Sequence, residues 1–238
     1  MDVPKGIHFG WRTGVPDSYS LLSSFIPPNH QSALDHLDFL LDYVESEVRK
    51  GHYTGPFSPS CLEQIIGPFR TSRLGVIPKS GSSKFCLIQD HSFPPDDSFP
   101  LINSMIDSSL FEGDWGTFSN CWLRVASAPP GAQAAIFDIE AAHRHSPISP
   151  EDQYLVCIMF EVNSIMRIYL DHCTCFGCSS SSGLFGCPAM PLLLFSLTKV
   201  SKTSFAGQST SFSFAILYPP PLHPNSLSHL TNPLSSVL

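Results

Sequence analysis

The sequence predicts an α+β fold, and three observations lead to this class. Leucine, valine and acidic side chains recur at helical spacing over residues 32–50. Two apolar runs, 74–79 and 84–90, are joined by the turn-forming Ser80-Gly81-Ser82-Ser83 and predict a β-hairpin. The elements follow one another as helices, hairpin, helix, strand and hairpin, which differs from a repeated strand–helix–strand unit.

Local signals give the bounds of the other elements. Ser58-Pro59 begins a short helix that ends before Gly67, and Pro129-Pro130-Gly131 ends a later one. We expect the acidic face of the first helix, which includes Glu47, to be solvated. The expected helices are 32–50, 59–66 and 115–128, and the expected strands are 74–79, 84–90, 134–138, 154–160 and 165–170.

Composition divides the chain into four parts. Residues 1–30 read as an N-terminal arm, 31–100 as a helical segment with the first hairpin, and 101–195 as a mixed helix and strand region. Residues 196–238 consist mainly of Ser, Pro, Leu and Phe, and their only charged side chains are Lys199 and Lys202. This last part is predicted to be a tail of low complexity without a packed structure.

Charge and apolar content limit the function classes. The net charge of −7 provides no global basic field for nucleic acid, so any polyanion contact has to come from a local patch. The N-terminus lacks a secretory pattern, and the longest apolar run, 183–197, is short and contains two prolines. We expect an intracellular protein, cytoplasmic or nuclear, that is neither secreted nor bound to a membrane. Neither a Gly-x-Ser-x-Gly elbow nor a phosphate-binding P-loop is present.

Asp138 is the residue that most needs an explanation. It ends the apolar run 134–138, where an unpaired carboxylate is costly unless it is solvated, hydrogen-bonded or bound to metal. A cap of the following loop and a metal ligand are both compatible with this position.

Four short blocks stand in order along the middle of the chain, at 74–79, 84–92, 137–148 and 176–185. In this order they resemble a reverse transcriptase of the retroelement type, in particular the tyrosine-recombinase-associated and related fungal elements. The resemblance covers roughly residues 50–190. It implies a partial right-hand polymerase fold, with a fingers β-hairpin in 31–100 and an incomplete palm sheet in 101–195.

The resemblance also implies an activity and its ligands. The family is an RNA-directed DNA polymerase that transfers nucleotides by a two-metal mechanism. Its partners are an RNA or DNA template–primer and a deoxynucleoside triphosphate, and its cofactor is Mg²⁺ or Mn²⁺, which prefers oxygen ligands. Asp138 matches the first metal-binding aspartate of the palm.

Further site residues follow from the same resemblance. Their shared role is contact with the nucleotide. The resemblance implies that the two lysines and the backbone after Asp138 contact its phosphates, that position 143 contacts its sugar, and that the small-residue loop contacts its base. They are Lys79, Lys84, Ile139, Glu140, His143, Gly177 and Ser179. The chain departs from the family at Cys86, where an arginine is usual, at His143, where Tyr or Phe is usual, and at Ser182, where proline is common.

The second aspartate motif of the family is missing from this sequence, because no acidic residue follows Asp171. Asp138 alone does not hold two metals, so we expect a fragment that is inactive as given. A non-catalytic nucleic-acid or protein interaction module derived from such an element is the alternative. A third hypothesis is a zinc protein built on Cys173–Cys187, which the absence of a second clean Cys-x-x-Cys half argues against.

Overall fold

The computed structural model describes residues 2–94, 99–111, 118–128, 133–187, 203–209 and 212–217. The chain divides into two compact units. The first combines Met1–Asp114 with Ile139–Pro191, and the second combines Trp115–Asp138 with Leu192–Leu238. Each unit therefore joins two stretches that are far apart in the sequence.

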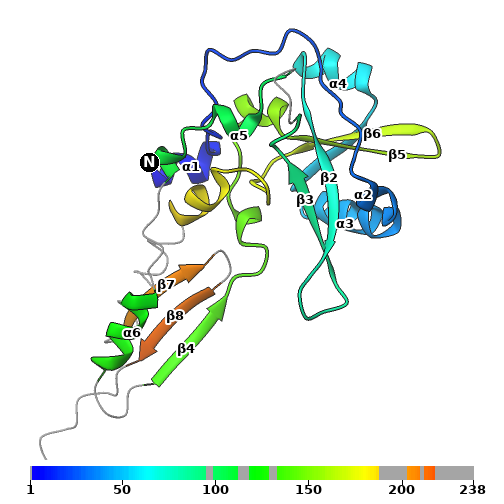
Figure 1. The fold of residues 1–238 in the computed structure, drawn as a ribbon. Helices are drawn as coiled ribbons and strands as arrows, with labels where there is room; N and C mark the ends of the chain where they lie inside the picture. Colours follow the sequence, from blue (N-terminus) through cyan, green and yellow to red (C-terminus); the bar gives the residue numbers. More distant parts are fainter. Residues whose placement is uncertain are drawn as a thin grey trace, which may run out of the picture. The chain divides into compact units, whose positions relative to one another are not determined.

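Helices and strands both occur in the two units, in agreement with the predicted α+β class (Figure 1). The helices are α1 (Val3–Phe9), α2 (Gln31–Leu34), α3 (Leu37–Arg49), α4 (Pro59–Ile66), α5 (Ile102–Met105), α6 (Phe118–Ala126) and the 3-10 helices η1 (Ser108–Phe111), η2 (Ala142–His145) and η3 (Pro150–Leu155). The strands are β1 (Tyr53–Phe57), β2 (Thr71–Pro78), β3 (Phe85–Asp90), β4 (Gln133–Asp138), β5 (Cys157–Val162), β6 (Ile165–Asp171), β7 (Thr203–Ser209) and β8 (Phe212–Leu217). Residues 181–187 are helical as well. No helix in the described part of the chain is long and apolar enough to cross a bilayer.

Five strands of the first unit form one mixed sheet in the order β1-β6-β5-β2-β3. β2 with β3 and β5 with β6 are antiparallel hairpins, as the sequence predicts. In the second hairpin the turn residues Asn163 and Ser164 have φ angles of 51° and 60°, the left-handed values that suit the twist of paired strands. A short parallel pairing of β2 with β5, at Thr71 and Cys157, joins the two hairpins into one sheet.

Helices cover both faces of this sheet. Successive side chains of a strand point to opposite faces. Ile158 of β5 packs in the cluster that contains Leu40 of α3, whereas its neighbour Cys157 packs in the cluster that contains Leu62 of α4. Because the two contacts alternate along one strand, α3 and α4 lie on opposite faces.

The N-terminal arm is packed into the first unit. Trp11 is only 4% exposed and belongs to a third apolar cluster with Ile102 and Leu184. Its backbone N–H donates to the Pro147 carbonyl at 2.8 Å, and its carbonyl accepts from the Ser149 N–H at 2.9 Å. The arm is held by a buried indole and by pairing with a segment more than 130 residues away.

The predicted helices of the first unit are confirmed, with one division. The helix expected over 59–66 is α4, and the Ser58 hydroxyl caps it by accepting from the Cys61 N–H at 3.3 Å. The helix expected over 32–50 is divided into α2 and α3, because His36 has φ −124° and ψ 41°. The His36 Nδ1 donates to the Ser32 carbonyl at 2.9 Å, so this carbonyl has a hydrogen-bond partner although the helix is interrupted there.

In the second unit β4, β8 and β7 form a three-stranded antiparallel sheet. The strand expected over 134–138 is β4, which ends at Asp138. The prediction of an unstructured tail over 196–238 is wrong for β7 and β8, and the rest of that range lies outside the described residues. Aromatic and aliphatic residues alternate with small ones along β8, a pattern that satisfies the period of a strand although the region is poor in charge.

Candidate functional site

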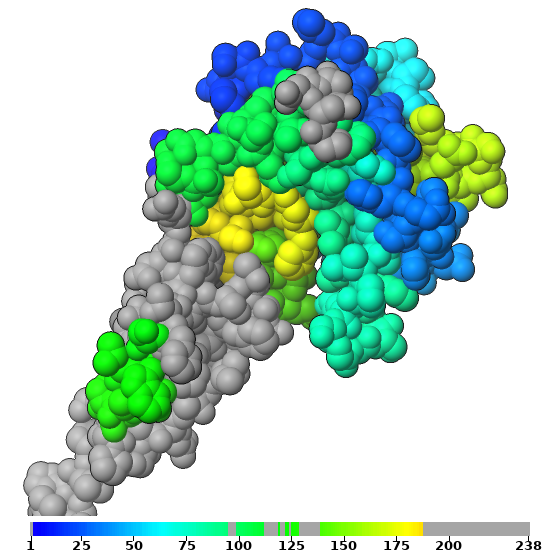
Figure 2. Space-filling model, in the orientation of Figure 1, coloured from blue at the N-terminus to red at the C-terminus, as the bar shows by residue number. Residues whose placement is uncertain are grey.

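Three of the four sequence blocks meet in the first unit, around the loop that begins at Phe176. The Gln89 N–H of β3 donates to the Phe176 carbonyl at 3.2 Å. Two residues before the loop, the Thr174 hydroxyl donates to the His143 carbonyl at 2.5 Å. In the space-filling view the yellow segment that contains this loop lies between the teal hairpin β2–β3 and the green segment that contains α5 (Figure 2). Segments up to about 90 residues apart in the sequence thus pack against one another.

Gly177 allows the loop to approach β3 this closely. Its φ is 118°, and a Cβ atom built on it would lie 1.8 Å from the Gln89 carbonyl oxygen. Only glycine combines this backbone conformation with this contact. Gly177 and Ser179 are both exposed, so the side of the loop away from β3 is open to solvent.

His143 lies under the loop. Its ring is 3% exposed and meets the rings of Phe176 and Phe185 edge-on, at centroid distances of 4.7 and 6.2 Å. Burial lowers the pKa of the imidazole, which is therefore neutral near pH 7. Phe176, at 44% exposed, is the aromatic side chain that this region presents to solvent.

Lys79 and Lys84 face each other at the end of the β2–β3 hairpin. The Lys79 N–H donates to the Lys84 carbonyl at 2.8 Å, and both side chains are exposed. Cys86 is half-buried in β3. The two lysines give this hairpin a local positive end on an acidic chain.

Asp138 belongs to the second unit, and only its backbone lies within the described structure. It is the last residue of β4 and pairs with Phe212 of β8. Ile139 and Glu140 begin the return to the first unit; Ile139 is half-buried and Glu140 is exposed. The Glu140 carbonyl accepts a hydrogen bond from the Nε2 of His145, the last residue of η2, at 3.0 Å.

Arg144 is the central buried charge of the first unit, and the sequence did not predict this role. Its Nε donates to Glu47 at 2.9 Å, and its Nη1 lies 2.8 Å from an Asp171 oxygen. The guanidinium also lies over the Tyr53 ring, 4.9 Å from the centroid. Gln89 of β3 donates from Nε2 to Asp171 at 2.9 Å. This network, defined by these five side chains, joins α3, β1, β3, β6 and η2.

Ionisation within this network follows from its partners. Burial by itself lowers the pKa of Arg144, but the adjacent charge of Asp171 raises it well above its ordinary value. Burial by itself raises the pKa of Glu47, but hydrogen bonds from Lys50 and His52 and the charge of Arg144 lower it to about 2. Arg144 and Glu47 are therefore both charged at neutral pH.

The acidic face of the first predicted helix is exposed as expected except at Glu47. Glu47 is 2% exposed, like the core residues Leu40 and Val44 on the same helix. Positions 40, 44 and 47 follow the i, i+4, i+7 spacing of one helix face, so the period itself contained the signal. An acid at a core-facing position indicates a buried cationic partner, here Arg144.

A second buried polar group joins Cys175, His91 and Ser72. The His91 Nε2 lies 3.1 Å from the Cys175 sulfur, and its Nδ1 lies 2.9 Å from the Ser72 hydroxyl. Burial and the charge of Arg70 lower the pKa of His91 to about 4, and burial raises the pKa of the Cys175 thiol well above its ordinary value. The pair is neutral and buried, which does not fit an activated nucleophile.

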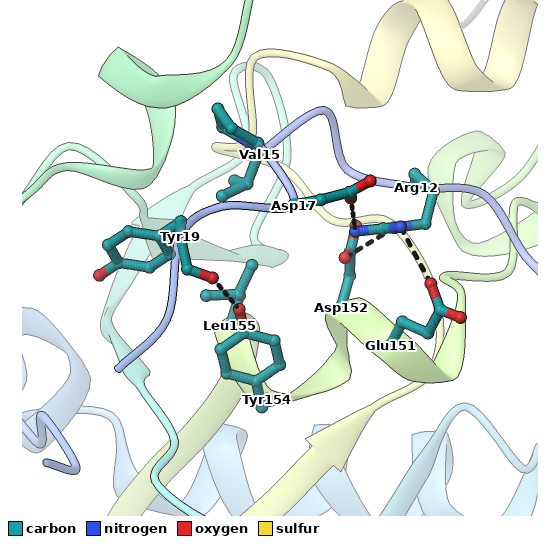
Figure 3. A pocket seen from close by; sticks show the side chains of 9 residues that line it. Arg12, Val15, Asp17, Tyr19, Glu151, Asp152, Tyr154 and Leu155 are labelled. Atoms are coloured by element: carbon teal, nitrogen blue, oxygen red, sulfur yellow. Dashed lines mark hydrogen bonds and ion pairs between the residues drawn. The ribbon is translucent and has the colours of Figure 1, made fainter. Parts of the chain in front are cut away.

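A surface hollow of about 280 Å³ lies between the N-terminal arm and η3 (Figure 3). Arg12 bonds there to Asp17, Glu151 and Asp152 at 2.7, 2.9 and 2.8 Å. Asp152 is 1% exposed and also accepts from the Thr13 N–H and hydroxyl. These ion pairs and hydrogen bonds attach the N-terminal arm to η3.

Within the described ranges, no three or more His, Cys, Asp or Glu side chains gather closely enough to hold a metal ion. Cys173 and Cys175 of the proposed zinc segment are buried thiols, and the pKa of each is raised by burial. The sequence matches no family model and no curated protein.

Replacing Arg144 by methionine is expected to destabilise the first unit by about 3–5 kcal/mol, because Glu47 and Asp171 would remain buried without a cation. Urea unfolding followed by circular dichroism measures the change. Arg49→Met is the matched control, since its ion pair with Glu45 at 3.4 Å is on the surface and should cost no more than about 0.5 kcal/mol. Equal effects of the two variants would contradict the assigned role of Arg144.

Acid is expected to weaken the fold through His91. Its pKa in the folded protein, about 4, lies below the ordinary 6.5, so the unfolded chain takes up the proton first. The stabilisation is fully present above pH 6.5 and is lost as the pH falls towards 4. Between about pH 7.5 and about pH 5 the free energy of unfolding should fall by about 2 kcal/mol from this residue. His91→Gln should reduce this slope and the exposed His8→Gln should not; an unchanged slope in His91→Gln would contradict the assignment.

Proposed function

We propose that this chain is a fingers and front-palm module of reverse-transcriptase type that binds template–primer duplex but does not itself transfer nucleotides. One observation carries the proposal: the loop that begins at Phe176 packs against both the strand β3 and the turn at His143 in the first unit. These segments are three of the four blocks on which the resemblance rests. Such convergence is expected if the blocks share a function, and it is not required by their sequence spacing.

The chemistry of this surface supports a nucleic-acid partner. Exposed Phe176 offers a ring on which a base or sugar can stack. The exposed backbone at Gly177 and Ser179 allows close approach of a ligand. At the opposite end of the β2–β3 hairpin from the loop contact at Gln89, exposed Lys79 and Lys84 supply the local positive charge that the chain as a whole lacks.

Among the described residues of the first unit, the buried carboxylates do not fit a two-metal centre, because each is already bound by other groups of the protein. Asp171 and Glu47 are bound to Arg144, and Asp152 is bound to Arg12 and Thr13. No acid follows Asp171 in the sequence. Only Asp138 remains as the metal ligand that the resemblance implies, and a single carboxylate does not hold two Mg²⁺ or Mn²⁺ ions. This favours a function in binding without catalysis. The alternative predicted from the sequence, a non-catalytic interaction module derived from such an element, has the same expectation.

The purified chain is expected to give no primer extension with magnesium or manganese, on an RNA or a DNA template. The physical reason is the lack of carboxylates for a second metal. Denaturing gel electrophoresis of a labelled primer measures the product. Extension that is abolished by Asp138→Ala would overturn the claim that the chain is inactive.

Template–primer duplex is expected to bind with an affinity that falls with salt, as phosphate contacts do. The double variant Lys79→Ala/Lys84→Ala should reduce the slope of log affinity against log salt by about 1–2, one for each lost phosphate contact. Fluorescence anisotropy at several salt concentrations measures both quantities. Lys5→Ala, on the exposed helix α1, is the control for loss of a positive charge elsewhere. No binding by the wild-type chain at low salt would overturn the proposed function.

A further inference from the structure

Asn103 of α5 binds the loop that the proposed function places against the nucleic acid. Its Nδ2 donates to the Gly177 carbonyl and to the Ser92 hydroxyl, each at 2.8 Å. Its Oδ1 accepts from the Ser179 N–H at 2.9 Å. Both ends of the side-chain amide are engaged, so its orientation is fixed by its partners.

The helix that carries Asn103 is itself firmly held. Ile102 is completely buried in the cluster that contains Trp11, and the Asn103 N–H donates to the His91 carbonyl at 3.2 Å. A side chain supported in this way can impose a shape on a neighbouring loop, because its own rotamer and backbone do not give way.

Asn103 binds a part of the loop that contacts β3 at Gly177 but receives no hydrogen bond from a β-strand of the described structure. The bond from Gln89 secures the loop at Phe176 only, whereas Asn103 binds residues 177 and 179 on either side of Cys178. The solvent side of Gly177 and Ser179 stays exposed. Asn103 therefore holds the loop at two points, while Gly177 and Ser179 themselves remain exposed and can contact a ligand.

We propose that Asn103 is a positioning residue that holds the Phe176–Ser179 loop in the shape that receives template–primer duplex. The proposal rests on the proposed function and adds to it a residue outside the four sequence blocks. An exposed loop loses conformational freedom when a ligand binds it, and a loop that is already ordered loses less. The interaction of Asn103 with Gly177 and Ser179 supplies this order before the ligand arrives.

The test combines amide hydrogen exchange with binding on the full chain. In Asn103→Ala the Ser179 amide should exchange about three- to tenfold faster, the equivalent of one lost hydrogen bond. The affinity for template–primer duplex, measured by fluorescence anisotropy at low salt, should fall by about five- to tenfold. Ser104→Ala is the matched control, since this neighbouring hydroxyl donates to the carbonyl of Leu101, the residue before α5, and not to the loop. It should change neither quantity.

The outcomes separate this proposal from the proposed function. Unchanged Ser179 exchange in Asn103→Ala would overturn the positioning role, and faster exchange with unchanged affinity would overturn its importance for binding. If the Ser179 amide exchanges faster in Asn103→Ala than in the wild type, but the wild type binds no duplex, the positioning role stands and the proposed function is overturned. If circular dichroism shows that Asn103→Ala is unfolded, Asn103→Ser has the same expectations, because its side chain is polar but too short to reach Gly177.

Discussion

The ion pair of Arg144 with Asp171 and Glu47 is the interaction on which the first unit depends. These three charges come from a turn, a strand and a helix, and each is almost completely buried. Such groups are tolerated inside a protein only when they bind one another, so the three elements have to meet in one arrangement. The bond from Gln89 to Asp171 extends this requirement to β3. The same Gln89 donates its backbone N–H to the Phe176 carbonyl, so the network contacts the loop directly.

The Arg144 network also determines where the loop at Phe176 lies. Arg144 is adjacent to His143, and Gln89 provides both the side chain that binds Asp171 and the backbone N–H that binds Phe176. The buried network and the exposed loop therefore share two short segments. The same network removes Asp171 and Glu47 from the carboxylates that a metal could use, so the interaction that stabilises the surface also limits its chemistry.

Much of the first unit could be predicted from the sequence, because its signals are local. The helix α4 and the two hairpins follow from a cap, a proline, turn residues and strand-like runs. The burial of Glu47 was also present in the helix period, but its partner was not, since Arg144 lies 97 residues further along. The strands β7 and β8 were not predicted, because the charge-poor composition of residues 196–238 indicates disorder and the alternation along each strand is short. Asn103 had no sequence signal at all, since an isolated asparagine looks the same in any loop.

The sequence by itself determined the α+β class and, to within one residue, the bounds of α4, β3, β6 and the strand β4 that ends at Asp138. These properties depend on neighbours within a few residues, or on residue identity alone. Only the tertiary structure decided that Trp11 packs beside Ile102, that His143 lies beneath Phe176, and that Asn103 holds Gly177. Each of these contacts joins segments more than 30 residues apart, and the energy of such a contact depends on burial and distance, which no local pattern contains.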